Sequence, residues 1–182
     1  KPERKKFIEQ EPKKKIKRKP WTRLDLVVSV LVKKLASGEK AMLIGPKIGG
    51  PIHGYIAPVG GKVRPSDYSL PYAARRECRE ECGYNPENGP LVAIVKVITY
   101  GLRRTATIYV YENVRWKGRF KLDEKSFPWL LFVPYSQIPW EQFPPRDEDW
   151  MRRVFLEGKR LRVTIRCGTH RRYVKTITCK PL

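Results

Sequence analysis

The sequence lacks the features that would place it in a membrane or in a disulfide-linked scaffold. No apolar run approaches the roughly 18 residues that a helix needs to cross a bilayer, so we predict no membrane segment. The four cysteines, at positions 78, 82, 167 and 179, form no disulfide framework, and the first two lack the usual spacing of zinc ligands. There is no internal repeat either. We therefore expect reduced thiols in an intracellular protein.

Carboxylates are also scarce. The sequence has 18 Asp and Glu and 39 Lys and Arg, which gives a net charge of +21. Residues 1–20 contribute +7 of this, so the excess is not confined to one end. Residues 158–182 hold eight Lys and Arg and no carboxylate side chain. A field of this sign attracts polyanions such as nucleic acid, nucleotides or an acidic lipid surface. The alternative is a solubilising or targeting tail on a basic protein.

The N-terminal segment differs in composition from the rest of the chain. Residues 1–20 are rich in Lys and Pro and lack apolar periodicity, which predicts a flexible basic arm before one folded domain over residues 21–182. A start at Lys1 rather than Met is compatible with processing on import into an organelle. The three glutamates of the arm are nevertheless atypical of a transit peptide. We expect a cytoplasmic or organellar location, with the mitochondrion as one candidate.

The remaining sequence mixes strand and helix patterns and predicts an α/β fold. A helix is expected from Ser69 to Glu81, ending at Gly83, and a second one over residues 146–158. The Gly/Pro-rich stretch 45–67 predicts a long loop with one short strand. The expected strands of the sheet are Leu24–Val32 paired with Ala41–Gly45, residues 91–100, 105–114 and Trp129–Tyr135, and a closing hairpin of 161–167 with 173–179.

The expected first helix carries an unusual cluster of acids, "RRECREECGY" at residues 75–84. On a helix, Glu77, Glu80 and Glu81 project near one edge of the same face. Three carboxylates this close repel one another unless a cation neutralises them, and hard oxygen ligands suit Mg²⁺ or Mn²⁺. Arg76 can brace the helix against the preceding loop. A solvated Glu/Arg face is the alternative reading of the same residues.

The segment "GGKVRPSDYSLPYAARRECREECGY" resembles the Nudix box, the signature of Nudix hydrolases. Residues 76–84 match the Arg, the three Glu and the Gly of its second half, with Cys78 and Tyr84 at the apolar positions. The first half departs, since Asp67 stands where the box has Glu, and one extra residue separates it from Arg76. The resemblance implies a Nudix-type α/β/α sandwich with a mixed sheet, a loop–helix–loop box and a C-terminal β-hairpin.

The resemblance also implies a set of site residues. Glu77, Glu80 and Glu81, with the main-chain carbonyl of Gly60, would bind one to three divalent ions, most often Mg²⁺ and alternatively Mn²⁺. Arg76 would complete the catalytic set, and Asp67 would pair with it as a brace for the loop. A distant acid would come from Asp123 or Glu124, of which Glu124 is the candidate metal ligand. Lys62 and Asp147 are the candidate substrate contacts.

The C-terminal third resembles the tail of the MutT-homologue oxidised-purine nucleoside triphosphatases, with an I-P turn, an acidic loop, a helix and a hairpin in the same order. The departures lie where that branch reads the base. Pro144 replaces its Trp, Arg146 its first Asp and Ala57 its Asn, while Asp147 matches its second Asp. Asp147 could contact a base or serve as the N-cap of the following helix.

Three functions remain open from the sequence. The first is a pyrophosphohydrolase that converts a nucleoside triphosphate, including oxidised purine nucleotides, to monophosphate and pyrophosphate. The second acts on RNA 5′ ends and holds RNA through the basic arm and the C-terminal hairpin, with aromatic residues such as Trp116, Phe120 and Tyr173 as stacking partners or, alternatively, as packing residues. The third is a Nudix-fold subunit of a ribonucleoprotein such as a mitochondrial ribosome. The sequence gives no oligomeric state.

Overall fold

The computed structural model describes residues 20–87, 89–169 and 173–182. The predicted arm at residues 1–20 therefore lies outside the described residues, apart from Pro20. Within the described part of the chain, no helix is long and apolar enough to cross a membrane.

The first hairpin forms as the sequence predicted. Strand β1 (Thr22–Lys34) is longer than expected at both ends, and its β-branched middle is buried at Val27 and from Val30 to Val32. Strand β2 (Lys40–Pro46) runs antiparallel to it, with Val32 opposite Met42. The long apolar run identified both strands correctly, because strands covered on both faces are apolar at successive positions.

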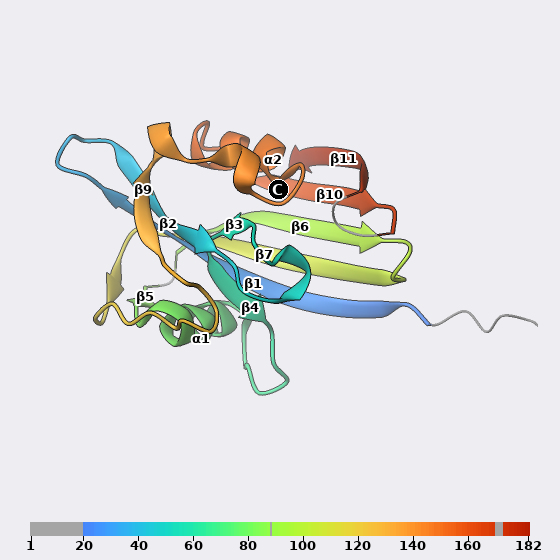
Figure 1. The fold of residues 1–182 in the computed structure, drawn as a ribbon, viewed down its shortest axis with the longest axis horizontal. Helices are drawn as coiled ribbons and strands as arrows, with labels where there is room; N and C mark the ends of the chain where they lie inside the picture. Colours follow the sequence, from blue (N-terminus) through green and yellow to red (C-terminus); the bar gives the residue numbers. More distant parts are fainter. Residues whose placement is uncertain (1–19, 88, 170–172) are drawn as a thin grey trace, which may run out of the picture.

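The principal sheet has the strand order β11-β10-β6-β7-β1-β2-β3, as Figure 1 shows. Strands β6 (Leu91–Thr99) and β7 (Arg104–Asn113) form one predicted hairpin, and β10 (Leu161–Cys167) and β11 (Val174–Pro181) form the predicted closing hairpin. The sheet is mixed, because β1 runs parallel to β7 and β10 runs parallel to β6.

The Gly/Pro-rich stretch contains more structure than the single short strand that we predicted. It forms a 3₁₀ turn (Gly50–Ile52) and two strands, β3 (Ile56–Ala57) and β4 (Val59–Lys62). Strand β4 exists because β1 extends beyond its pairing with β2 and leaves the edge of residues 26–29 free for an antiparallel partner. The position of β4 places the glycines at 60 and 61 inside the sheet.

Helix α1 (Leu70–Cys82) begins and ends where the sequence indicated. The Ser69 hydroxyl accepts a hydrogen bond from the Tyr72 amide at 3.2 Å, and Pro71 lies in the first turn, where no amide hydrogen is needed. Gly83 ends the helix in the left-handed region, with φ of 76°, a conformation that favours glycine.

Helix α2 (Asp147–Phe155) is shorter than the predicted range of residues 146–158. Its N-cap is Arg146, with φ of 71°, so of the two roles considered for Asp147 the structure excludes the N-cap. Asp147 is the first helical residue, and its carboxylate accepts a hydrogen bond from the Trp150 indole at 2.9 Å. The side chain folds back along its own helix because Trp150 stands one turn further along the chain.

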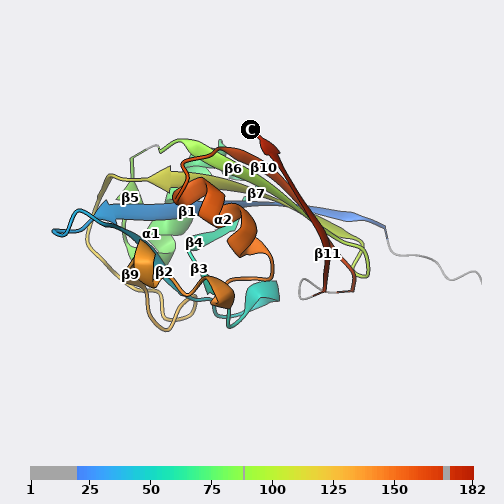
Figure 2. The same ribbon diagram turned by 90° about the horizontal axis from the view of Figure 1, so that it is seen from above.

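The two helices pack against opposite faces of the sheet and make an α/β/α sandwich, as predicted (Figures 1 and 2). Helix α2 buries Trp150, Met151, Val154 and Phe155 against the larger core cluster. Helix α1 packs Ala73 and Ala74 against the other face, where small side chains allow a close approach.

Shorter elements connect these layers. Strand β9 (Leu131–Pro134) pairs with β2 and is shorter than the predicted strand 129–135, and two 3₁₀ turns follow at Tyr135–Gln137 and Trp140–Gln142. Strands β5 (Asn85–Pro86) and β8 (Trp116–Lys117), which we did not predict, form a separate two-stranded sheet.

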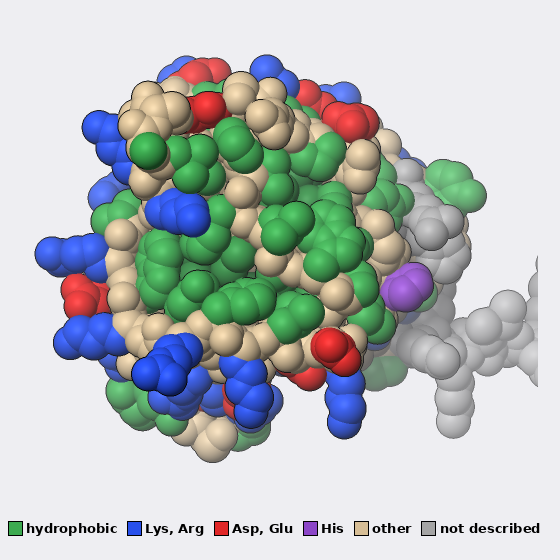
Figure 3. Space-filling view, turned by 60° about the vertical axis from the view of Figure 1, so that its left-hand side comes forward, with side chains coloured by type: hydrophobic (Ala, Val, Ile, Leu, Met, Phe, Trp, Pro, Cys, Tyr) green, Lys and Arg blue, Asp and Glu red, His purple; other side chains and the backbone are tan. Residues whose placement is uncertain are grey.

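An aromatic row continues from the two-stranded sheet to β9. Phe120, Tyr84, Trp116 and Phe132 follow one another at ring-centroid distances of 5.6–5.8 Å. Figure 3 shows hydrophobic side chains gathered on the side of the molecule that carries β9, with Lys and Arg side chains around them. Because these rings pack on one another, Trp116 and Phe120 serve packing in this structure.

The four cysteines are free thiols, which agrees with the sequence expectation of no disulfide framework. Cys78 and Cys82 lie one turn apart on α1, with their sulfur atoms 3.6 Å apart. Both are fully buried in the cluster beneath the helix, so they act here as core residues.

Candidate active site

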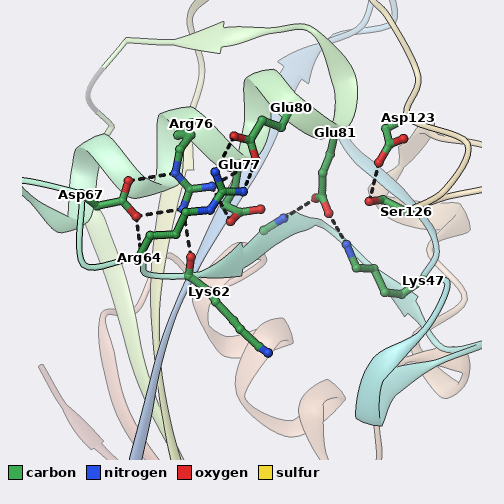
Figure 4. Close-up of polar contacts among 11 residues, drawn as sticks. Lys47, Lys62, Arg64, Asp67, Arg76, Glu77, Glu80, Glu81, Asp123 and Ser126 are labelled. Carbon is green, nitrogen blue, oxygen red and sulfur yellow. Dashed lines mark hydrogen bonds and ion pairs between the residues drawn. The ribbon is translucent and has the colours of Figure 1, made fainter.

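The three box glutamates occupy one edge of α1, beside strand β4 (Figure 4). Glu77 and Glu81 are buried, whereas the Glu80 side chain keeps 43% of its surface exposed. The structure therefore brings together the acids that the box resemblance singled out. Each of the three carboxylates contacts a cationic side chain of the chain itself.

Arg76 and Asp67 form the buried brace of this site. The Asp67 carboxylate accepts two hydrogen bonds at 2.8 Å, from Nε and from Nη2 of Arg76, and its side chain is only 1% exposed. Hydrogen bonding to Arg76 lowers the pKa of Asp67 to about 2, although burial acts in the opposite direction. The shorter acid thus makes a bidentate pair, and the extra loop residue lets it reach the guanidinium.

The remaining donors of Arg76 fix the helix and the loop together. Its Nη1 donates to Glu77 at 2.7 Å and to Glu80 at 3.1 Å, and its Nη2 donates to the Lys62 carbonyl at 2.9 Å. One buried guanidinium therefore orients two glutamates and the end of β4. A buried ion pair of this kind depends on all of its partners, because an unpaired buried charge is costly.

Glu81 is held from the opposite side. The Gly60 amide donates to one of its oxygens at 2.8 Å, and the Lys47 ammonium contacts the other. Burial raises the pKa of Glu81, while Lys47 and the Gly60 amide oppose this shift by stabilising the charged form. Lys47 also lies 4.4 Å above the Phe127 ring. The lysine is thereby positioned by an aromatic face as well as by the carboxylate.

Glu80 is the outermost of the three acids. Arg64 donates to both of its oxygens, at 3.0 and 2.7 Å, and the Arg64 side chain is half exposed. An exposed pair is worth little because water competes for both partners. Arg64 can therefore leave Glu80 for an incoming anion at small cost.

The chemistry of the donor set suits a hard divalent cation, although each acid is paired with a basic side chain in this structure. Three carboxylates at one helix edge are the oxygen ligands that Mg²⁺ prefers. Gly61 lies directly against Glu77, since a Cβ there would come within 2.4 Å of a carboxylate oxygen, so the missing side chain makes the room that Glu77 occupies. Among the described residues, no group of three or more His, Cys, Asp or Glu is arranged to hold a metal ion, because each acid is turned toward its own cation.

Asp123 and Glu124, the two candidates for the distant acid, differ in their contacts. The loop of residues 121–127 passes the end of α1, where the Asp123 amide donates to the Glu81 carbonyl at 2.9 Å. The Asp123 carboxylate accepts a hydrogen bond from Ser126, which lowers its pKa, while Glu124 is exposed. Figure 4 shows Asp123 with its Ser126 partner beside the Glu81 end of α1, and the assignment of Glu124 as a metal ligand stays a prediction.

Two further candidates do not join the acidic cluster. The Lys62 side chain is exposed and points away from the glutamates in Figure 4, although its carbonyl contacts Arg76. The Asp147 carboxylate contacts Trp150 of its own helix. Neither contact shows a bound substrate group, so both assignments remain predictions.

Sequence reasoning missed Lys47 and Arg64, the cations paired with Glu81 and Glu80. Lys47 follows β2, 34 residues before its partner, and nothing in its local sequence marks it. Arg64 carries a weak signal, since it is a basic residue in the loop between the glycine pair and the helix.

The NUDIX domain family model matches residues 25–158, so the chain belongs to the Nudix family. Nudix proteins of this kind are hydrolases of nucleoside diphosphate-linked substrates, and the chain is a Nudix hydrolase of MutT-like fold. The matched range includes the whole box and ends before β10, so the closing hairpin lies outside it. A comparison with curated proteins finds no match.

Solved structures with this fold include several MutT proteins. The MutT protein of Bacillus halodurans superposes with a TM-score of 0.71 at 16% identity, over 87% of this chain and 99% of that one. The MutT protein of Methanosarcina mazei Go1 gives 0.59 at 20% identity, over 76% and 97%. The NUDIX domain of Shewanella oneidensis NrtR, solved with ADP ribose, gives 0.55 at 17%, over 63% and 75%.

Proposed function

We propose that the protein is a Mg²⁺-dependent pyrophosphohydrolase that converts a nucleoside triphosphate to the monophosphate and pyrophosphate. The observation that carries the proposal is the fixed arrangement of Glu77, Glu80 and Glu81 on one edge of α1, with Arg76 holding the first two and Lys47 and the Gly60 amide holding Glu81. Mg²⁺, with Mn²⁺ as the alternative, would supply charge neutralisation for the phosphates and orient the attacking water.

The residues of the chain would divide the work around the phosphates. Arg76 and Asp67 hold the helix edge in place, so that the glutamates need little reorganisation when substrate arrives. Lys47 and Arg64 also contact the acids, and once released from Glu81 and Glu80 they would bind phosphate oxygens. The resemblance of the C-terminal third of the sequence to MutT-homologue nucleoside triphosphatases supports free nucleotides as substrates, with oxidised purine nucleotides among them.

RNA 5′ ends are the second candidate substrate. The observation that favours RNA is the charge of residues 158–182, which contain eight Lys and Arg and no carboxylate side chain. The chemistry at the glutamates would be unchanged, because a 5′-triphosphate presents the same phosphate chain as a free nucleotide.

The test measures pyrophosphate release with Mg²⁺ from a panel of nucleoside triphosphates, oxidised purines included, and from a 5′-triphosphorylated RNA. Glu81→Gln should lower turnover about 10³-fold, since such a site contributes several kcal/mol to the barrier. Glu87→Gln, which removes an exposed acid paired with Arg115, is the matched control and should leave turnover unchanged.

Each outcome assigns the protein differently. Turnover of free nucleotides identifies the preferred base, whereas turnover of RNA alone moves the assignment to 5′-end processing. Equal rates for the wild type and Glu81→Gln would refute the catalytic role of the box. If neither substrate is hydrolysed but RNA binds tightly, the result would indicate a Nudix fold retained for assembly into a ribonucleoprotein.

A further inference from the structure

The sheet face on which α1 packs extends beyond that helix and is left uncovered there. We call it the open face and define it as the outward side chains of residues 23–25, 94–98, 105–107, 162–166 and 176–180. Along β6 and β10 the alternate side chains, such as Val95 and Val163, are buried in the core cluster that contains α2. Helix α1 packs against the opposite side of that core only near Val27 and Tyr109. The right-hand half of the sheet in Figure 2 extends beyond both helices.

Strand register collects positive charge on the open face. Arg162 lies opposite Lys180, Thr164 opposite Lys96, and Thr105 pairs with both Ile98 and Arg23. The cations of the face are Arg23, Lys96, Arg162, Arg166 and Lys180, and its acid is Asp25. Within the described parts of the chain, none of these five cations forms an ion pair. They are available to an external anion.

An aromatic pair continues this face at one end. Trp21 directly precedes β1 and Tyr100 directly follows β6, so both rings lie at the end of the sheet that carries Arg23 and Ile98. Their ring centroids are 6.0 Å apart, and they are 44% and 46% exposed. The Arg103 guanidinium lies 5.6 Å from the Trp21 ring. Exposed aromatic rings beside cations offer stacking surfaces for nucleobases.

Threonine hydroxyls fill the space between the cations. The outward positions include Thr105, Thr107, Thr164, Thr176 and Thr178. A hydroxyl both donates and accepts, so it can bind a phosphate oxygen or a ribose 2′-hydroxyl, and the latter exists in RNA alone. With strands about 4.8 Å apart and residues about 3.3 Å apart, the cations span roughly 19 by 13 Å, which suits one extended strand.

We propose that the open face binds single-stranded RNA through its phosphates and riboses, with the aromatic pair stacking on bases. Charge complementarity favours this partner, and the even spread of threonines favours RNA over an apolar protein surface or a lipid bilayer. The inference does not rest on the proposed catalytic function. It requires only the strands, and the glutamate edge of α1 takes no part in it.

The test measures binding of the full chain to a fluorescent, 5′-hydroxyl, unstructured RNA oligonucleotide across a salt series. Arg162→Gln/Arg166→Gln should weaken binding about tenfold and reduce the log–log salt slope by about 1.4, since each phosphate contact to a single strand contributes about 0.7. Lys34→Gln/Lys40→Gln removes the same charge at the far end of β1 and β2 and should leave the slope unchanged.

Equal losses in the two double variants would overturn the proposal, because they would show a response to net charge alone. Thermal unfolding and nucleotide turnover report whether Arg162→Gln/Arg166→Gln is intact, and Lys96→Gln/Lys180→Gln provides a second pair on the same face. In the wild type, equal binding of DNA of the same sequence, or stronger binding of anionic phosphatidylserine vesicles or polyglutamate, would also refute it. Thr164→Val/Thr178→Val should reduce the preference for RNA over DNA without changing the salt slope.

Discussion

The cations of the active site and those of the open face differ in whether carboxylates neutralise them. At the site, Lys47, Arg64 and Arg76 each contact a carboxylate, and Arg76 contacts three of them. On the open face, five cations share the surface with Asp25 and form no ion pair within the described residues. Both regions adjoin the same sheet, yet only the site has its charge neutralised internally.

This difference separates two uses of basic residues in one chain. A buried, paired cation fixes geometry, because its partners and its desolvation leave it one favourable position. An exposed, unpaired cation fixes little, but it contributes to the external field and can exchange counterions for phosphates. The net charge of +21 therefore says less about function than the local balance does. The following predictions test whether the two regions are as independent as this comparison implies.

The largest expected effect is at the brace. Arg76→Met leaves Asp67 and Glu77 buried without their cation, so the free energy of unfolding should fall by about 3–5 kcal/mol. Urea unfolding measures this loss. Arg152→Met, which breaks an exposed pair with Glu148, is the control and should cost less than about 1 kcal/mol. Similar losses in both variants would mean that Arg76 is not a structural anchor.

A smaller effect is expected at Lys47. Lys47→Met removes the cation that contacts buried Glu81, and the unfolding free energy without Mg²⁺ should fall by about 2 kcal/mol. Mg²⁺ should restore much of this loss, because a bound metal would neutralise the same carboxylate. Urea unfolding with and without Mg²⁺ gives the difference. Lys159→Met, at an exposed pair with Glu157, should show no such recovery. A loss independent of Mg²⁺ would argue against Glu81 as a ligand.

The smallest effect concerns pH. The pKa of Asp67 is about 2 in the folded protein against an ordinary 3.8, so its ionised form stabilises the fold above about pH 4. That contribution is lost as the pH falls toward about 2. The stability difference between the wild type and Asp67→Asn should therefore stay constant from about pH 7 to 5 and shrink between about pH 4 and 2. Urea unfolding across this range measures it, and a difference that grows on acidification would reverse the sign and contradict the pairing.

Local signals in the sequence were sufficient for much of the fold. Ser69, Pro71 and Gly83 set the bounds of α1, and the apolar runs located the hairpins of the sheet. Only one short strand was expected in residues 45–67, because V-G-G-K shows no alternation and β4 forms only where β1 offers an edge. The role of Asp147 stayed open because an acid near the start of a helix can be a cap or a first-turn residue, and only the structure places it in the first turn.

The site residues, too, were predictable only where a local sequence signal marks them. The box spacing identified Arg76 and the three glutamates, since residues of one helix keep their relation in any fold. Lys47 could not be found, because its partnership with Glu81 depends on how β2 meets the helix. The alternating basic residues of "LRVTIRC" are visible in the sequence, but their alignment with Lys96 and Arg23 is a property of register across strands.

The sheet is completed only when β10 pairs with β6, so the two regions are completed at different points during synthesis. Every residue of the glutamate edge and its brace lies between positions 47 and 81, whereas the open face needs β1 near position 23 and β11 near position 180. Contacts so far apart in the chain form late and slowly. A nascent chain would thus assemble its acidic edge first and acquire its basic platform last, which delays exposure of that platform to RNA until the sheet is closed.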